Sequence, residues 1–286
     1  RWYALAFIAI YGLHLALVIY ALPLDAMLGD RPYASPDYQT HFGQTTMLSE
    51  TLDRFGKHWA YDPSMLAGSP VGLIFDVDNK LHFLFTYALT KIGMKATAAF
   101  NLFTFVTSML APLSIWLAAR MFRVGRRAEL IATGFSVLLW HFDSSARAWT
   151  GGMVSFSMVS HTSLAVLGLY YRMIKDGAWR YLIPQLVILP LSLLTHVWTF
   201  SVLVVPMVGL YLRDLRRLKL KNHVQVWGLA GFALAVNLYW LVPALQHIDL
   251  IRTSGVVGQA KAPPTTTLPK PEHDPHFLPK SWRLRG

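Results

Sequence analysis

The sequence predicts an all-α polytopic membrane protein with about seven transmembrane helices and a large extracytoplasmic first loop that carries interfacial helices. Three observations lead to this fold class. Hydrophobic residues make up 54% of the 286-residue chain, and charged residues only 14%. Several apolar runs are longer than the helices of a soluble core require. An acid-rich stretch, residues 25–80, separates the first apolar run from the others.

The first transmembrane helix is expected within residues 1–24. This segment lacks a convincing small-residue cleavage site, so we interpret it as an anchor rather than a removed signal peptide. Residues 25–96 then form the first loop. Its stretch 25–80 holds eight acidic residues against four Lys or Arg. Basic residues near membrane spans are retained in the cytoplasm. A loop with this excess of acidic residues is therefore expected on the extracytoplasmic side.

The last part of this loop is apolar but short. Residues 81–92 form a run of twelve residues, whereas a helix needs about 20 to cross a bilayer core of ~30 Å. We therefore expect a helix that lies in the outer interface. The next run, residues 97–119, is long enough to cross and leads into an arginine-rich turn. From here residues 97–247 are expected to form a bundle of about six transmembrane helices.

The remaining spans are expected at residues 129–141, 153–171, 181–194, 197–212 and 224–245. This threading places twelve basic residues on the cytoplasmic side, as the positive-inside rule requires. They are Arg120, Arg123, Arg126, Arg127, Arg172, Lys175, Arg180, Arg213, Arg216, Arg217, Lys219 and Lys221. The outer turns are then residues 143–152, a tight turn at Thr195 and His196, and the C-terminal segment.

Residues 248–286 are expected to form a Pro-rich extracytoplasmic tail that is extended or disordered.

The chain carries a formal net charge of +11. Its basic residues sit in short clusters between apolar spans, which membrane topology explains, so no nucleic-acid partner is expected. The chain has no cysteine, which excludes a disulfide framework and a thiolate metal site. Because it begins with Arg1, we expect a processed chain or a fragment.

Asp37 and His41 place a carboxylate and an imidazole four residues apart at the expected start of a helix. Pro36 favours the first helical position, and residues at i and i+4 share a face. In the first turn the helix dipole favours ionised Asp37, which suits it to accept a proton or to hold a cation. A purely structural N-terminal cap is the equally weighted alternative. The helix that follows, residues 39–55, has the mixed pattern of a helix lying on a membrane surface.

Two further carboxylates, Asp76 and Asp78, precede Lys80 just before the interfacial helix. Alternating Asp residues can form a metal-ligand pair, although this motif lacks the Gly and the distal Glu of a calcium loop. Lys80 could neutralise a phosphate or extend to lipid headgroups. The pattern leaves open a divalent metal, Mg²⁺ or Mn²⁺, as a cofactor.

The order of these parts resembles the GT-C superfamily of integral-membrane glycosyltransferases. The closer likeness is to bacterial and archaeal members whose first loop carries a motif represented here by Asp37, His41, Trp59, Gly68 and Pro70. Three later segments also echo the superfamily: residues 147–152 (Arg-Ala-Trp-Thr-Gly-Gly), residues 194–196 (Leu-Thr-His) and residues 237–243 (Asn-Leu-Tyr-Trp-Leu-Val-Pro). The resemblance extends over residues 1 to about 247.

The resemblance implies transfer of a sugar from a polyprenyl-phosphate donor to a glycan or protein acceptor, on the outer face of a bacterial or archaeal inner membrane. Asp37 would be the catalytic base on the acceptor hydroxyl, or a ligand of an assisting metal. The substrate-binding candidates are His41, Lys80, Arg147 and His196. Arg147 could grip phosphate bidentately, with interfacial snorkelling as its alternative. His196 could contact phosphate or acceptor, or cap orphan helix carbonyls.

A second function class also fits the sequence. The chain departs from the GT-C pattern because it stops where a folded outer domain usually begins and lacks an adjacent pair of acidic residues in its first loop. The alternative is a non-catalytic accessory subunit of a larger membrane complex, whose partners would be membrane lipid and other membrane subunits. Ion-coupled transport is disfavoured because ionisable residues are nearly absent from the middle of the spans.

Overall fold

The computed structural model describes residues 1–33, 35–62, 69–73 and 79–247. Helix α1 (Trp2–Ala21) is the expected first span, and its 20 residues match the length that a bilayer core requires. The predicted tail, residues 248–286, lies outside the described residues.

The first loop contains three helices and two short strands. Its elements are α2 (Leu24–Met27), α3 (Pro36–Phe55), β1 (Ala60–Asp62), β2 (Ser69–Val71) and α4 (Lys80–Lys91). A helix over residues 39–55 is therefore confirmed as part of α3, which begins with a proline and ends at Gly56 in the left-handed conformation, whereas its position on a membrane surface stays a prediction. The antiparallel strand pair, with Tyr61 opposite Pro70, was not expected from the sequence.

The remaining helices follow the expected apolar runs closely. They are α5 (Ala96–Phe122), α6 (Arg126–His141), α7 (Asp143–Gly151), α8 (Val154–Asp176), α9 (Trp179–Thr195), α10 (Trp198–Asp214), the 3₁₀ turn η1 (Leu215–Arg217) and α11 (Leu220–Gln246). Helices α5 and α8 extend beyond the predicted spans into basic residues, whose long aliphatic stems can lie against apolar surface. The expected outer turn at residues 143–152 was wrong, because most of it forms α7.

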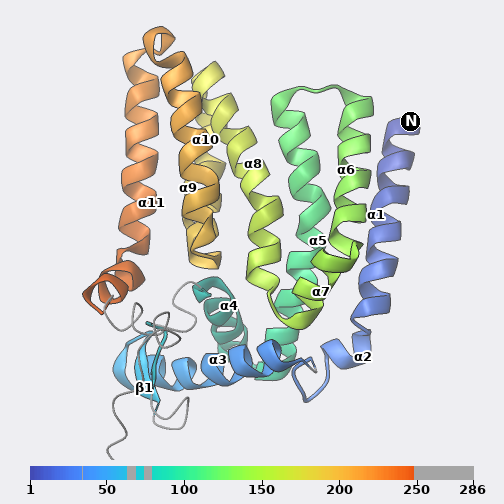
Figure 1. The fold of residues 1–286 in the computed structure, drawn as a ribbon, viewed down its shortest axis with the longest axis vertical. Coiled ribbons are helices and arrows are strands. Elements are labelled where there is room, and N and C mark those ends of the chain that lie inside the picture. Colours follow the sequence, from blue (N-terminus) through green and yellow to red (C-terminus); the bar gives the residue numbers. More distant parts are fainter. Residues whose placement is uncertain (34, 63–68, 74–78, 248–286) are drawn as a thin grey trace, which may run out of the picture. The chain divides into compact units, whose positions relative to one another are not determined.

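An all-α membrane protein is confirmed by this architecture. Within the described part of the chain, four helical segments are long and apolar enough to cross a membrane: α1, α5, α10 together with η1, and α11. Figure 1 shows α6, α8 and α9 running alongside them in the same unit. The predicted number of about seven crossings stays a prediction.

Charge is segregated between the two ends of this bundle. The N-terminus and the turns α5–α6, α8–α9 and α10–α11 lie at one end, whereas α2, α3, β1 and α4 lie at the other (Figure 1). The twelve basic residues of the predicted cytoplasmic turns therefore gather opposite the acid-rich loop. This arrangement agrees with the threading derived from the positive-inside rule.

Close contact between α5 and α8 forms the centre of the bundle. At Gly168 of α8, an added Cβ would lie 3.0 Å from the Cβ of Met121 and 3.1 Å from the Cα of Ala118. Small residues let helix backbones approach in this way, and in a membrane such packing replaces the hydrophobic driving force. This contact lies at the last turn of α5, in the half of the bundle opposite the first loop.

Candidate functional site

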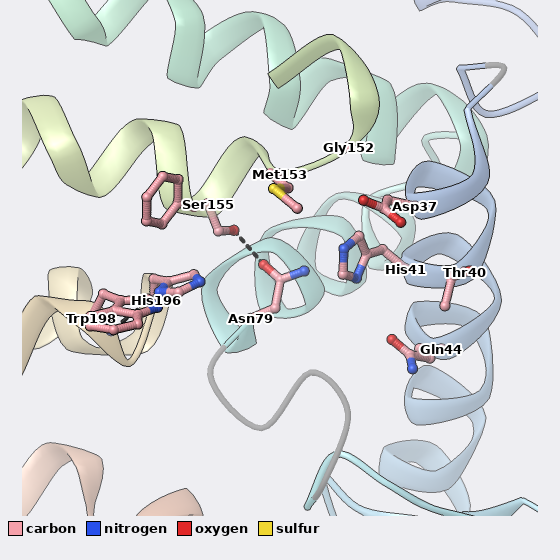
Figure 2. Close-up of a pocket in the computed structure, with 11 residues that line it drawn as sticks. Asp37, Thr40, His41, Gln44, Asn79, Gly152, Met153, Ser155, His196 and Trp198 are labelled. Carbon is pink, nitrogen blue, oxygen red and sulfur yellow. Dashed lines mark hydrogen bonds between the residues drawn. The ribbon is translucent and has the colours of Figure 1, made fainter. Parts of the chain in front are cut away.

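A cavity of about 500 Å³, lined by many polar side chains, lies at the loop end of the bundle. Its wall comes from the start of α3, the start of α8 and the α9–α10 turn (Figure 2). The lining residues are Asp37, Thr40, His41, Gln44, Asn79, Gly152, Met153, Ser155, Phe156, His196 and Trp198. Segments that are more than 150 residues apart in the sequence therefore meet in one hollow.

Helix α3 supplies one wall of the cavity. Asp37, His41 and Gln44 recur at helical spacing, so they lie on one face of α3. Figure 2 shows the Asp37 carboxylate and the His41 ring next to each other on this face. The prediction that Asp37 and His41 share a face is confirmed. No side-chain cap hydrogen bond is made at the N-cap of α3, Ser35.

The start of α3 is fixed by the end of α7. The Ser35 hydroxyl donates to the Gly151 carbonyl, and the Tyr38 hydroxyl donates to the Trp149 carbonyl at 2.5 Å. These hydroxyls satisfy carbonyls that the end of a helix leaves without intrahelical partners. Gly152 follows with φ +117°, a conformation that favours glycine, and its Cα faces Asp37 directly. Asp37 is therefore positioned by the chain around residue 150.

His196 lies across the cavity from α3. It ends α9 in an extended conformation, and its Nδ1 accepts a hydrogen bond from the Trp198 backbone N–H at 3.2 Å. Its ring also meets the Phe156 ring edge-on, with centroids 5.6 Å apart. These contacts fix the imidazole at the cavity wall (Figure 2). The structure thus brings His196 to the same cavity as Asp37 and His41.

Asn79 and Ser155 connect the two sides, and sequence reasoning missed both. The Ser155 hydroxyl donates to the Asn79 Oδ1 (Figure 2), joining the start of α8 to the start of α4. Asn79 precedes α4, where asparagine usually caps the helix. Its side chain makes no cap bond and bonds to Ser155 instead. The local signal therefore indicated a cap, whereas the tertiary contact gives Asn79 a place in the cavity wall.

Lys80 lies elsewhere than predicted. Its side chain is completely buried, and Nζ donates to the carbonyls of Gly72 at 2.9 Å and His58 at 3.2 Å. It is absent from the cavity wall, so its ammonium joins α4 to the loop rather than facing a substrate there. Burial lowers the pKa of His58 to about 4, and the charge of Lys80 adds to this effect.

Arg147 also lies outside the cavity. It forms an ion pair with Asp143 one turn earlier in α7, and its side chain is 75% exposed. Its neighbour Trp149 is buried instead, and the Trp149 indole donates to the Trp140 carbonyl at 2.9 Å. Residues 147–152, which resembled a glycosyltransferase segment, therefore contribute to the site through their backbone and through Gly152. Arg147 itself does not contribute to the cavity wall.

The predicted metal ligands Asp76 and Asp78 lie outside the described residues. Within the described part of the chain, no group of three His, Asp or Glu side chains is arranged to hold a metal ion. Asp37 is the only carboxylate among the described residues that line the cavity. What this wall offers chemically is one carboxylate, two imidazoles, and the hydroxyl and amide groups of Thr40, Gln44, Asn79 and Ser155.

An apolar groove of about 270 Å³ adjoins the cavity. Three helical stripes line most of it: Leu110, Leu113, Ser114 and Leu117 of α5; Met158, Thr162 and Ala165 of α8; and Ile188, Leu191, Ser192 and Thr195 of α9. Each stripe follows the spacing of one helix face. Met158 lies one turn beyond Ser155, and Thr195 directly precedes His196. The groove and the cavity are therefore lined by neighbouring turns of α8 and by consecutive residues at the end of α9.

One family model matches the chain. It is described as "6-pyruvoyl-tetrahydropterin synthase related domain; membrane protein" and covers residues 81–271, which is two thirds of the sequence. Ser155 and His196 lie within the matched segment, whereas Asp37 and His41 precede it. No curated protein and no solved structure matches the chain.

Proposed function

The chain belongs to the family of membrane proteins with a 6-pyruvoyl-tetrahydropterin synthase related domain, and we propose that it is a membrane glycosyltransferase acting on a polyprenyl-phosphate sugar. The acceptor is a glycan or protein on the extracytoplasmic face of a bacterial or archaeal inner membrane. One observation carries the proposal: Asp37, His41 and His196 line a single cavity, and an apolar groove is lined by the neighbouring turns of α8 and α9.

The groove supports a lipid-linked donor. A polyprenyl phosphate joins a long hydrocarbon chain to a charged headgroup, so it needs an apolar channel that ends at a polar site. In the proposal, the groove lined by α5, α8 and α9 holds the hydrocarbon chain, and the cavity holds the charged headgroup. This juxtaposition favours an amphipathic substrate over a small polar one, whose binding would leave the groove unused.

Asp37 is the base in the proposed displacement. The acceptor hydroxyl oxygen bonds to the anomeric carbon of the donor sugar while the bond between that carbon and the phosphate oxygen breaks. The hydroxyl proton passes to the Asp37 carboxylate, and the polyprenyl phosphate leaves with the electron pair. Asp37 lies in the first turn of α3 and lines the cavity in which the acceptor hydroxyl would bind.

His41 and His196 are the proposed phosphate ligands. Each imidazole can donate a hydrogen bond from a ring N–H to a phosphate oxygen, His196 through Nε2 because its Nδ1 accepts from the Trp198 backbone, and the two rings approach the cavity from two different elements. Of the four substrate-binding candidates predicted from the sequence, His41, Lys80, Arg147 and His196, these two line the cavity. A divalent ion, Mg²⁺ or Mn²⁺, with Asp76 and Asp78 as ligands stays a prediction, and no step described here depends on it.

The test is sugar transfer by the full chain in proteoliposomes, with a panel of polyprenyl-phosphate sugars as donors. The variants are Asp37→Asn and the matched control Asp53→Asn. Asp53 lies on the same helix but bonds to Tyr87 and Lys91 at the surface. We expect Asp37→Asn to lower turnover about 100-fold or more, because positioned general bases contribute roughly 10²–10⁴-fold. Asp53→Asn should retain the parent rate.

Thermal unfolding of both variants shows whether the fold is intact. Equal turnover by the parent and Asp37→Asn would remove Asp37 from the mechanism. A folded parent without turnover on any donor of the panel would favour the accessory-subunit alternative.

A further inference from the structure

The end of the bundle opposite the cavity carries a dense positive charge. Between residues 172 and 221 the chain has eight Lys or Arg against two Asp, Asp176 and Asp214. The turns that carry these basic residues lie together at the end where the N-terminus also lies (Figure 1). This charge has no role in the proposed transfer reaction, whose cavity is at the other end.

Only part of this charge is balanced by ion pairs. Buried Asp214 accepts hydrogen bonds from Arg213 at 2.7 Å and from Lys175 at 3.2 Å. Arg216 and Arg217 of η1 are exposed, and neither forms an ion pair with any residue that the structure describes. Two guanidinium groups are therefore available for an anion from outside the chain.

These arginines border a hollow of about 720 Å³. Its lining residues are Lys175, Leu212, Arg213, Asp214, Leu215, Arg216 and Arg217. Arginine binds phosphate through a planar fork of donors, and a partly enclosed group of cations holds an anion better than scattered surface charges do. The hollow is thus suited to a phosphate group.

Aromatic rings place this hollow at headgroup depth. Arg213 lies over the Tyr171 ring at 5.8 Å, Arg172 over the Tyr181 ring at 5.4 Å, and Lys221 over the exposed Trp179 ring at 5.8 Å. Tyrosine and tryptophan gather at membrane–water interfaces, where their apolar bodies and polar tips are both satisfied. A phosphate bound here would sit among lipid headgroups.

An apolar groove of about 230 Å³ lies between α10 and α11 on the way to this end. Core residues such as Leu203 and Leu229 form its floor, and exposed Val204, Val208 and Trp227 form its rim. The stripe of α10 that lines the groove reaches Tyr211, and the next turn carries Asp214 and Leu215 of the basic hollow. One helix therefore carries an apolar groove followed by a cationic hollow.

We propose that this end of the bundle is a binding site for an anionic glycerophospholipid. Arg216, Arg217 and Lys175 hold the phosphate headgroup, and one acyl chain lies in the groove between α10 and α11. The charge of the hollow selects an anionic headgroup over a zwitterionic one, and the groove selects a lipid over a soluble phosphate. This site is independent of the proposed function, because it shares no lining residue with the cavity of Asp37.

The experiment measures binding of phosphatidylglycerol to the purified full chain in detergent by native mass spectrometry. The double variant Arg216→Gln/Arg217→Gln is compared with Arg126→Gln/Arg127→Gln, a matched exposed arginine pair at the same end of the bundle. We expect the first pair to weaken binding about 30-fold, because both guanidinium groups border the hollow and would contact the phosphate directly. The control pair lies outside the hollow, so it should change binding by less than about 3-fold.

A groove variant tests the acyl chain separately. Val208→Trp fills the rim without changing any charge, and we expect it to weaken phosphatidylglycerol binding while its unfolding temperature stays at the parent value. Equal weakening by both arginine pairs would overturn the site in favour of diffuse surface attraction. Equal binding of phosphatidylcholine, or binding of soluble glycerol phosphate as tight as that of the lipid, would overturn it as well.

Discussion

Gly152 is the residue on which the geometry of the cavity depends most directly. Its φ of +117° lies in a region that side chains disfavour, and an added Cβ would lie 2.5 Å from the Asp37 Cβ and 2.8 Å from the Tyr38 nitrogen. Both neighbours belong to the start of α3, where backbone cannot yield as a flexible side chain can. Glycine is therefore required here for close approach between α7 and α3.

We expect Gly152→Ala to displace the start of α3, with a loss of stability of about 2 kcal/mol from the strained backbone and the collision together. Any activity that depends on Asp37 should fall in parallel. Gly151→Ala is the matched control, since nothing lies within 4 Å of a Cβ added there. Thermal unfolding and the transfer assay measure both effects, and equal behaviour of the two variants would contradict this account.

His58 makes the docking of the first loop sensitive to pH. Its pKa falls from 6.5 to about 4 because the ring is buried beside Lys80, and the ring meets Tyr239 of α11 edge-on at 4.6 Å. Between these two pH values the undocked imidazole binds a proton that the docked one does not. Docking of the loop should therefore weaken as the pH falls from 6.5 towards 4.

Hydrogen exchange of the amides of β1 and β2 measures this effect, after correction for the intrinsic pH dependence of exchange. We expect faster exchange at pH 5 than at pH 7 in the parent protein. His58→Phe keeps an aromatic ring against Tyr239 but cannot be protonated, so its exchange should lose this pH dependence. His223→Phe, at the other end of the bundle, should retain it, and a parent protein without any such dependence would contradict the assignment.

At the scale of elements, α11 is attached to α9 by one buried amide. Asn237 Nδ2 donates to the Ala233 carbonyl at 2.8 Å and to the Pro190 carbonyl of α9 at 3.3 Å. The Trp240 indole in turn donates to Asn237 Oδ1 at 2.6 Å. The Asn-Leu-Tyr-Trp segment that resembled a glycosyltransferase motif thus joins two helices beside the site.

We expect Asn237→Leu to lower the free energy of unfolding by about 1–2 kcal/mol, because side-chain hydrogen bonds between membrane helices contribute roughly 0.6–2 kcal/mol. Thermal unfolding in detergent checks this value. Gln246→Ala removes an exposed amide from the same helix and serves as the control. A change of equal size in both variants would indicate that Asn237 does not join the helices.

Helix α7 shows why local sequence patterns were insufficient to predict the secondary structure around the site. Its nine residues are too polar and too few for an apolar-run criterion, and the sequence predicted a turn. The segment is held as a helix by tertiary contacts: Trp149 stacks on Trp140 with centroids 5.7 Å apart, and Tyr38 bonds to its last turn. Short helices gain most of their stability from such packing.

At the scale of the whole molecule, the separation of charge predicts orientation in the membrane. The chain has no cysteine, so single cysteines can be introduced without background. We expect a membrane-impermeant maleimide to label Lys57→Cys protein in intact cells and to label Lys219→Cys protein only after permeabilisation. The opposite pattern would invert the topology and would place the cavity in the cytoplasm.

The sequence by itself determined the membrane class, the positions of the apolar helices and the alternation of their turns between two ends of the bundle. These properties are local, because hydropathy and the placement of basic residues act on each segment separately. The face shared by Asp37 and His41 was predictable for the same reason, since both residues lie within one turn of a helix.

Only the tertiary structure decided which polar side chains meet. Asn79, Ser155 and His196 come from three separate elements, and their convergence depends on how each helix is rotated and docked. The same docking buried Lys80 among loop carbonyls, against both predictions for it, and left Arg147 on the surface outside the cavity. Spacing along the chain carries no information on contacts between distant helices, because these are fixed by packing that involves the whole bundle.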